Sequence, residues 1–210
     1  NKSRPFFLYY PTTVPHLALQ VPEDSLKEYE GAFPETPYPG GKGYLPHRTP
    51  RAAYAAMITR MDSMVGRLLQ TLRETGLDRN TLVIFTSDNG PHNESNHNLQ
   101  RFAPSGPLKG IKRSLTDGGI RVPCIAWWPG TIASGTSSSH VAYFGDWMAT
   151  AAELAHTQTP AGCDSISLVP TLTGKGEQAC HEWLYWEFHE KNFQQAALWQ
   201  GLKGSFFALA

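Results

Sequence analysis

The sequence predicts a layered α/β fold, and three segments carry that prediction. Residues 50–75 place apolar side chains at helical spacing. A short turn follows, and residues 80–87 then form a β-rich apolar run. A helix, a short turn and a buried strand in that order are typical of a sheet covered by helices. A continuous apolar run near the start, Phe6–Tyr10, predicts a further buried strand.

The composition is that of a globular chain and excludes several classes of protein. The 210 residues are 40% hydrophobic and 17% charged, which suffices for one domain with a sizeable core. Lys+Arg and Asp+Glu are both 18, so no basic excess indicates nucleic acid and no charge run indicates a membrane surface. No apolar run is long enough to span a bilayer. The three cysteines lack CxxC spacing, so neither a zinc site nor a redox motif is supported.

The predicted long helix has recognisable ends. Thr49 suits the N-cap, Pro50 the first helical position and Gly76 the C-terminal stop. Farther along, Ile120–Trp128 predicts another buried strand and Tyr143–Ala155 a second amphipathic helix. The apolar stripe of the long helix consists of Tyr54, Met57, Ile58, Met61, Val65, Leu68, Leu69 and Leu72.

The two ends of the chain suggest how it is organised. A buried strand almost at residue 1, with no initiator Met, suggests a chain cut from something longer. Residues 12–50 form a long Pro- and Gly-rich loop, and such loops are usually functional. From Glu182 the chain becomes aromatic, which suggests the first strand of a smaller subdomain. We therefore expect one domain over 1–178 and the start of a second over 179–210.

Asp88 and Asn89 stand where a predicted buried strand ends and a loop begins. Open α/β sheets place ligand sites at the carboxyl ends of their strands. An adjacent carboxylate and carboxamide offer hard oxygen donors that suit Ca²⁺ or Mg²⁺ better than zinc. Asp-Asn-Gly is also common turn chemistry, and the tripeptide alone favours that simpler interpretation.

Several cations follow in a glycine-rich segment, residues 106–121. Backbone N–H groups and side-chain cations converge in such a loop, which suits an oxyanion ligand. A solvated basic loop is the simpler interpretation when the segment is taken alone. The cations are Lys109, Lys112, Arg113 and Arg121.

Two histidines have positions that favour a functional role. His16 follows the first predicted strand, and His92 follows the Asp-Asn-Gly turn and could face the same cleft. A lone histidine is more often structural than catalytic. His47, His97 and His140 have no such positional support.

Taken together, these segments resemble the sulfatase family of the alkaline-phosphatase-like superfamily. The matching segments follow the family's order along nearly the whole chain. The family's metal-binding strand is matched by residues 81–92 and its lysine loop by residues 106–123. The two motifs at this separation are specific to the family. The resemblance implies a three-layer α/β/α sandwich with a mixed, mainly parallel sheet and the start of a small antiparallel C-terminal subdomain. The matching segments are Phe6–His16, Tyr54–Gly66, TLVIFTSDNGPH at 81–92, GPLKGIKRSLTDGGIRVP at 106–123, SISLVPTLTG at 165–174 and LYWEFH at 184–189.

The resemblance also implies roles for matching positions. Asp88 and Asn89 would be ligands of Ca²⁺, or of Mg²⁺. Lys112 would contact the sulfate, because the family's lysine lies five residues before the acid of the Glu-Gly-Gly motif, here Asp117. His16 would bind the sulfate or assist the leaving group, so His16 and Lys112 are the catalytic candidates. His92 is a weaker candidate for substrate contact.

The sequence departs from the family in identifiable places. The family's nucleophile is a formylglycine made from Cys or Ser in a Cys/Ser-x-Pro-x-Arg motif, which this chain lacks. The front Asp pair of the metal site is also missing. Asp117 stands where Glu is usual, and Thr116 where an aromatic residue is common. We therefore expect the nucleophile region to lie upstream and the chain alone to be inactive.

Three functions remain open at this point. The first is hydrolysis of sulfate esters, with carbohydrates as the expected substrates. The second is hydrolysis of phosphoesters or phosphonates by a relative in the same superfamily, and the third is a paralogue that binds sulfated glycans without cleaving them. A nucleophile motif upstream of Asn1 would favour an enzyme. The resemblance implies export to a periplasm, a lysosome or the medium, and it leaves the oligomeric state open.

Overall fold

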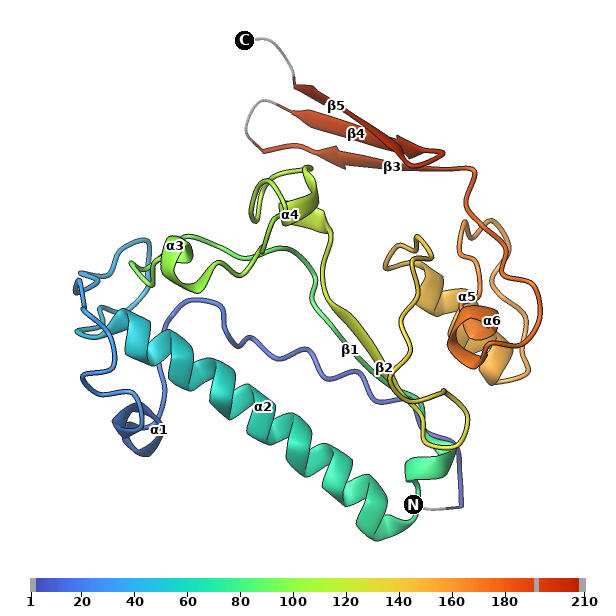
Figure 1. Ribbon diagram of the computed structural model, residues 1–210, viewed down its shortest axis with the longest axis horizontal. Helices are drawn as coiled ribbons and strands as arrows, with labels where there is room; N and C mark the ends of the chain where they lie inside the picture. Colours follow the sequence, from blue (N-terminus) through green and yellow to red (C-terminus); the bar gives the residue numbers. More distant parts are fainter. Residues whose placement is uncertain (1–2, 191–192, 208–210) are drawn as a thin grey trace. The chain divides into compact units, whose positions relative to one another are not determined.

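The computed structural model describes residues 3–190 and 193–207, in which the chain separates into two structural units (Figure 1). The first unit comprises Asn1–Asp78 with Pro91–Gly106, and the second comprises Arg79–Gly90 with Pro107–Ala210. The expected cut end at Asn1 lies outside the described residues. Within the described ranges, no helix combines the length and apolar character that a membrane crossing needs.

The first unit is built on the predicted long helix, α2 (Pro50–Thr75). The short helix α1 (Glu23–Lys27) lies against it, and α3 (Leu99–Phe102) follows in the returning segment (Figure 1). The predicted ends of the long helix are confirmed, since Pro50 occupies the first turn and Gly76 ends it with a left-handed φ of 69°. The core of the unit gathers at the helix start, where buried Tyr54 and Met57 pack with Leu19.

The N-terminus of α2 is capped by a different residue from the one predicted. Thr49 holds the N-cap position but makes no side-chain capping bond. The carboxylate of Glu35 does this instead: Oε2 accepts from Arg51 N at 3.1 Å and Oε1 from Ala52 N at 2.8 Å. A carboxylate at this end satisfies free N–H groups and interacts favourably with the helix dipole.

The predicted buried strand at Phe6–Tyr10 is not found. The segment carries no strand assignment, and its apolar side chains are exposed, with Phe7 at 83%. A strand is defined by ladder hydrogen bonds to a neighbour, and no described strand pairs with this segment. An apolar run indicates a tendency to be buried, but it does not show whether a neighbouring strand is present to pair with it.

In the second unit, β1 (Val83–Thr86) confirms the strand predicted over residues 80–87. It follows the 3₁₀ turn η1 (Asp78–Asn80) and pairs antiparallel with β2 (Cys124–Trp127), Val83 lying opposite Trp127. All pairings among the described strands are antiparallel, whereas we expected a mainly parallel sheet. Two antiparallel strands can be joined when the chain simply reverses direction, whereas two parallel strands need a longer crossover connection.

The second predicted strand of this unit begins later than expected. Residues Asp117–Ile120 form the short helix α4, and β2 starts only at Cys124. Pro123 has no N–H to donate to a ladder, which is consistent with a strand that starts after it. The strand is also less buried than predicted, since Ile125 is 60% exposed.

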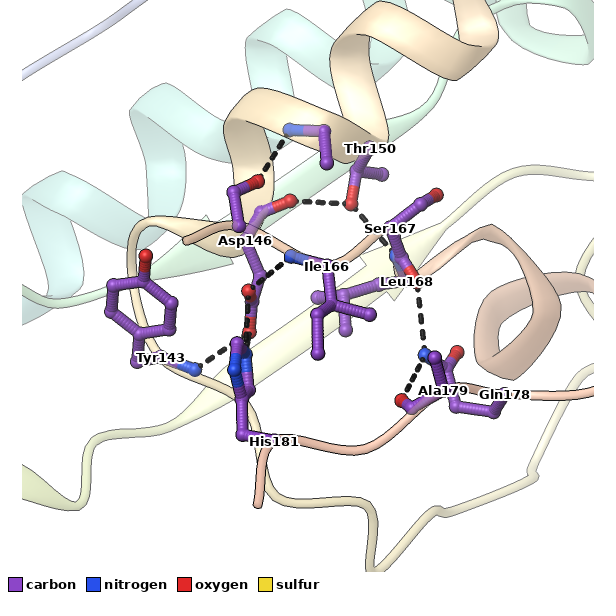
Figure 2. Close-up of polar contacts among 11 residues, drawn as sticks. Tyr143, Asp146, Thr150, Ile166, Ser167, Leu168, Gln178, Ala179 and His181 are labelled. Carbon is purple, nitrogen blue, oxygen red and sulfur yellow. Dashed lines mark hydrogen bonds and ion pairs between the residues drawn. The ribbon is translucent and has the colours of Figure 1, made fainter. Parts of the chain in front are cut away.

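The predicted second amphipathic helix is confirmed as α5 (Asp146–Leu154), which lies beside α6 (Val169–Thr173). Asp146, the first residue of α5, is fully buried. Its carboxylate contacts the backbone of two loops and the side chain of His181 (Figure 2). This polar cluster joins α5 to the segment that leads into the last sheet.

The aromatic rear segment forms a separate antiparallel sheet in the order β3-β4-β5. The strands are β3 (Trp183–Phe188), β4 (Gln194–Trp199) and β5 (Leu202–Phe207). Leu184 and Ala196 are buried, whereas Trp183 and Trp199, paired across β3 and β4, are exposed. The predicted antiparallel rear sheet is thus present.

Candidate active site

The Asp-Asn-Gly turn follows β1 directly, at the position predicted for hard oxygen donors. Asp88 is exposed and Asn89 is half-buried. The amide of Asn89 donates to Asp88 Oδ1, and Ser87 Oγ donates to the Asn89 carbonyl at 3.0 Å. Asp88 Oδ2 makes no hydrogen bond within residues 3–190 and 193–207. The turn is therefore ordered by its own side chains.

The chemistry of these donors fits a hard divalent cation but does not complete its coordination. A carboxylate and an amide oxygen are suitable ligands for Ca²⁺, which takes roughly six to eight of them. Among the described residues, no group of three or more His, Cys, Asp or Glu side chains could hold a metal. Asp88 and Asn89 alone would therefore supply only part of the ligands that such an ion needs.

The backbone of the Asp88-Asn89-Gly90 turn packs closely against the backbone of the lysine loop. Gly90 N donates to Gly119 O at 2.8 Å, and Gly118 N donates to Lys109 O at 2.7 Å. A Cβ on Gly90 would lie 1.9 Å from Gly118 O, and one on Gly118 would lie 2.1 Å from Gly110 O. Only glycine permits such an approach. The structure therefore brings the predicted metal ligands and the predicted sulfate-contacting loop together within the second unit.

Lys112 lies in this loop with a half-buried side chain. In the described part of the chain its ammonium has no hydrogen bond or ion pair, while its neighbour Arg113 pairs with Glu190 at 3.0 Å. Lys109 is exposed, and its carbonyl accepts from Thr116 Oγ1 at 2.7 Å as well as from Gly118. The loop thus holds its own backbone through Lys109 and leaves the ammonium of Lys112 available.

The two predicted histidines lie together in the first unit, with ring centroids 5.8 Å apart. The Nδ1 of His16 lies 2.9 Å from the Leu17 carbonyl. A carbonyl only accepts, so Nδ1 carries a hydrogen and donates it. The half-buried ring of His16 then has Nε2 free of partners among the described residues, which suits contact with a ligand.

The contacts of His92 differ from those of His16, because both of its ring nitrogens are used by the backbone. Glu94 N donates to Nδ1 at 3.3 Å, so Nε2 carries the hydrogen that faces the Pro15 carbonyl at 3.3 Å. The residue is only 8% exposed, and this burial lowers the pKa of His92. His92 is therefore a neutral donor to the residue directly before His16.

His97 is a member of this cluster that the sequence did not indicate. Its ring is fully buried, stacks on Tyr54 of α2 with centroids 4.4 Å apart and meets His92 edge-on at 4.8 Å. Its Nδ1 donates to the Glu94 carbonyl at 2.6 Å, and burial lowers the pKa of His97. No spacing rule marks this histidine, since it lies in a polar loop without periodicity. The ring of His97, held against Tyr54, therefore packs against the ring of His92 and supports its position.

Comparison with known proteins identifies what this chain is similar to. Residues 1–157 match the family model "Sulfatase", and residues 111–209 match the model "N-sulphoglucosamine sulphohydrolase, C-terminal". Human arylsulfatase A is 33% identical over 84% of this chain and 30% of its own length. Mouse steryl-sulfatase is 37% identical over 72% of this chain and 25% of its own length. The chain therefore spans about a quarter to a third of these relatives.

Solved structures agree with the sequence relatives. The crystal structure of Ps i-CgsB has a TM-score of 0.77 at 28% identity, covering 97% of this chain and 42% of that one. The structure of the same protein in complex with k-i-k-neocarrahexaose has a TM-score of 0.75 at 27% identity. Phosphonate monoester hydrolase from Silicibacter pomeroyi, at 22% identity and a TM-score of 0.58, shares the fold alone. With a family model that matches residues 1–157 and relatives of this similarity, the chain belongs to the sulfatase family.

Proposed function

We propose that the protein carrying this chain hydrolyses sulfate esters, most naturally those of carbohydrates. The proposal is based mainly on the close backbone contact, possible only with glycine, between the Asp88-Asn89-Gly90 turn and the loop of Lys112. The contact supports a site in which hard oxygen donors and the ammonium of Lys112, unpaired within residues 3–190 and 193–207, lie on adjoining backbones of a chain of the sulfatase family. The glycan substrate is supported by relatives whose names include N-acetylgalactosamine-6-sulfatase.

The proposed roles follow from the charge that develops during ester cleavage. Charge builds on the sulfuryl oxygens and on the leaving oxygen, and groups aimed at those atoms stabilise it. Lys112 supplies an ammonium for the sulfuryl oxygens, and His16 presents Nε2 to the sulfate or the leaving oxygen. Asp88 and Asn89 would hold part of a Ca²⁺ or Mg²⁺ site, and the ion, when bound, supplies Lewis-acid polarisation.

For His92 the proposed role is mainly one of support. Both ring nitrogens contact the backbone, and one of them holds the carbonyl that precedes His16. Direct contact between His92 and the ester would require breaking one of these bonds. We therefore propose that His16 contacts the substrate and that His92 supports the backbone at Pro15, directly before His16.

The complete protein is proposed to supply what this chain lacks. A formylglycine nucleophile would come from a preceding segment, together with further metal ligands and the strands of a three-layer sandwich. Residues 1–178 would be the central and rear part of its catalytic domain, and 179–210 would begin a C-terminal subdomain. This boundary is supported by the separate sheet that starts at Trp183. Export is proposed from the family resemblance.

The test uses the full-length protein and two chromogenic esters. Hydrolysis of 4-nitrophenyl sulfate and 4-nitrophenyl phosphate is measured with and without EDTA, for wild type, Lys112→Ala and the control Lys175→Ala. Lys175 is an exposed lysine far along the chain from the loop. We expect EDTA-sensitive sulfate release that falls by about a hundredfold or more in Lys112→Ala alone.

The other outcomes assign the protein elsewhere. Phosphate release equal to or better than sulfate release would move the protein to the phosphoester or phosphonate hydrolases. Turnover of neither ester, together with tight binding of sulfated oligosaccharide, would favour the non-catalytic glycan-binding protein. An equal loss in the Lys112 and Lys175 variants would contradict the role given to Lys112.

A further inference from the structure

The last sheet contacts the lysine loop through an ion pair between distant parts of the sequence. Lys203, the second residue of β5, places Nζ 2.7 Å from Oδ1 of Asp117. Its ammonium also lies 5.7 Å from the centroid of the Trp186 ring in β3, within cation–π range. The side chain of Lys203 is 19% exposed and that of Asp117 is 43% exposed. The pair is therefore only partly screened by solvent.

Two further contacts connect the same sheet region to the same loop. The buried amide of Gln194 in β4 donates Nε2–H to the Arg113 carbonyl at 3.5 Å. The Arg113 side chain pairs with Glu190, which lies just after β3, at 3.0 Å. The sheet and the residue that follows β3 thus hold the loop at Arg113, directly after Lys112, and again at Asp117.

The loop needs such support because little regular structure fixes it. Between Lys109 and Asp117 it contains no helix or strand, and it passes through left-handed conformations at Gly110, with φ 93°, and Arg113, with φ 69°. A left-handed arginine is unfavourable unless its surroundings hold it. The Lys112 side chain projects from this segment without a partner of its own among the described residues. Its position therefore depends on the backbone contacts around it.

We propose that Lys203 and Asp117 are positioning residues that hold the Lys112 loop of the active site against the rear sheet. The proposal rests on the function proposed above for Lys112. Neither residue is proposed to touch the substrate. A displacement of about 1 Å at a reacting group can cost about a hundredfold in rate, so loss of one anchor among several is expected to lower kcat/KM by about tenfold.

The experiment is a mutant cycle in the full-length protein, with 4-nitrophenyl sulfate as the probe. Lys203→Met and Asp117→Asn each remove the ion pair, while Lys203→Arg and Asp117→Glu keep it. Each change is made in wild type and in Lys112→Ala, with Lys175→Met as the control lysine. Thermal unfolding is recorded for every variant, and because partly exposed pairs contribute little to stability, the variants are expected to remain folded.

If the pair acts through Lys112, the neutral variants lose about tenfold in kcat/KM in wild type and less than about twofold in Lys112→Ala, and the charge-keeping variants recover most of the loss. A loss of the same size in both backgrounds would show a general structural role and overturn the proposal. Unchanged activity of Lys203→Met and Asp117→Asn in wild type would also overturn it. If Lys112→Ala itself leaves sulfate release unchanged, the role given to Lys112 fails and the positioning proposal fails with it. A wild-type protein that releases no sulfate from the ester would instead contradict the proposed function.

Discussion

Replacing Asp146 by alanine should destabilise the second unit more than any single change at its surface. The carboxylate is fully buried at the start of α5 and accepts hydrogen bonds from three donor groups (Figure 2). Oδ2 accepts from Tyr143 N at 3.0 Å, Oδ1 from Ile166 N at 2.8 Å, and His181 Nε2 lies 2.9 Å from Oδ1. The substitution leaves all three donors without an acceptor.

The magnitude follows from burial and from the charge of the acceptor. A hydrogen bond to a charged group contributes about 1.5–3 kcal/mol, and each donor left unsatisfied costs about 1–3 kcal/mol. These values are not additive, because the three donors share one carboxylate. With three donors losing one shared acceptor, we expect a loss of about 3–5 kcal/mol, at the low end of the sum of the separate contributions. The helix itself should survive, since Thr150 Oγ1 still donates to the carbonyl of residue 146 at 2.7 Å.

The assay is hydrogen exchange resolved to peptides, because two structural units need not unfold together. Amides at Tyr143 and Ile166, which donate to the carboxylate, should exchange at least about a hundredfold faster in Asp146→Ala, since each 1.36 kcal/mol corresponds to about tenfold. Asp164→Ala removes an exposed aspartate nearby and should change exchange by less than about threefold. Equal, small changes in the two variants would refute the reasoning that the buried carboxylate organises these loops.

Three further predictions concern the glycine contacts and the buried histidines. Gly118→Ala should destabilise the second unit by about 1–3 kcal/mol, because its Cβ would lie 2.1 Å from Gly110 O; urea unfolding measures this. Gly66→Ala, in an open position of α2, should instead stabilise the first unit by about 0.5–1 kcal/mol, and destabilisation there would contradict the helix geometry. Burial lowers the pKa of His97 below the value of about 6.5 in the unfolded chain, so protons bind the unfolded state first as pH falls. The first unit should therefore be most stable above about pH 6.5 and lose stability as the pH falls through the folded pKa, and His97→Phe should flatten that dependence; parallel pH profiles for the two proteins would contradict it.

The sequence predicted best those elements whose evidence is local and repeated. The stripe of α2 spans many turns, so the helix and both of its ends could be placed from spacing, Pro50 and Gly76. The strand before Asp88 was predicted from a short β-rich run and lies where expected. Each of these features depends mainly on neighbours within a few residues along the chain.

Features that depend on distant partners could not be predicted. Glu35 replaces Thr49 as the capping group because the loop folds back onto the helix, which no spacing rule indicates. Lys203 and Asp117 are 86 positions apart. The family resemblance singles out Asp117, but nothing in either segment indicates that the two side chains pair. The Phe6–Tyr10 run shows the opposite error, since its strong local tendency predicts a strand although no described strand pairs with it.

The glycine-rich segment shows why one pattern allows two physical interpretations. From the sequence, glycines beside Lys112 suggested a loop whose backbone N–H groups face an anion. In the structure, Gly90 N and Gly118 N are used by the protein's own carbonyls, Gly119 O and Lys109 O. Both uses require the absence of a Cβ, so composition alone cannot separate them. Since these two N–H groups are occupied, they are not available to an anion, and the proposed contact with sulfate is better tested at the side chain of Lys112 than at these glycines.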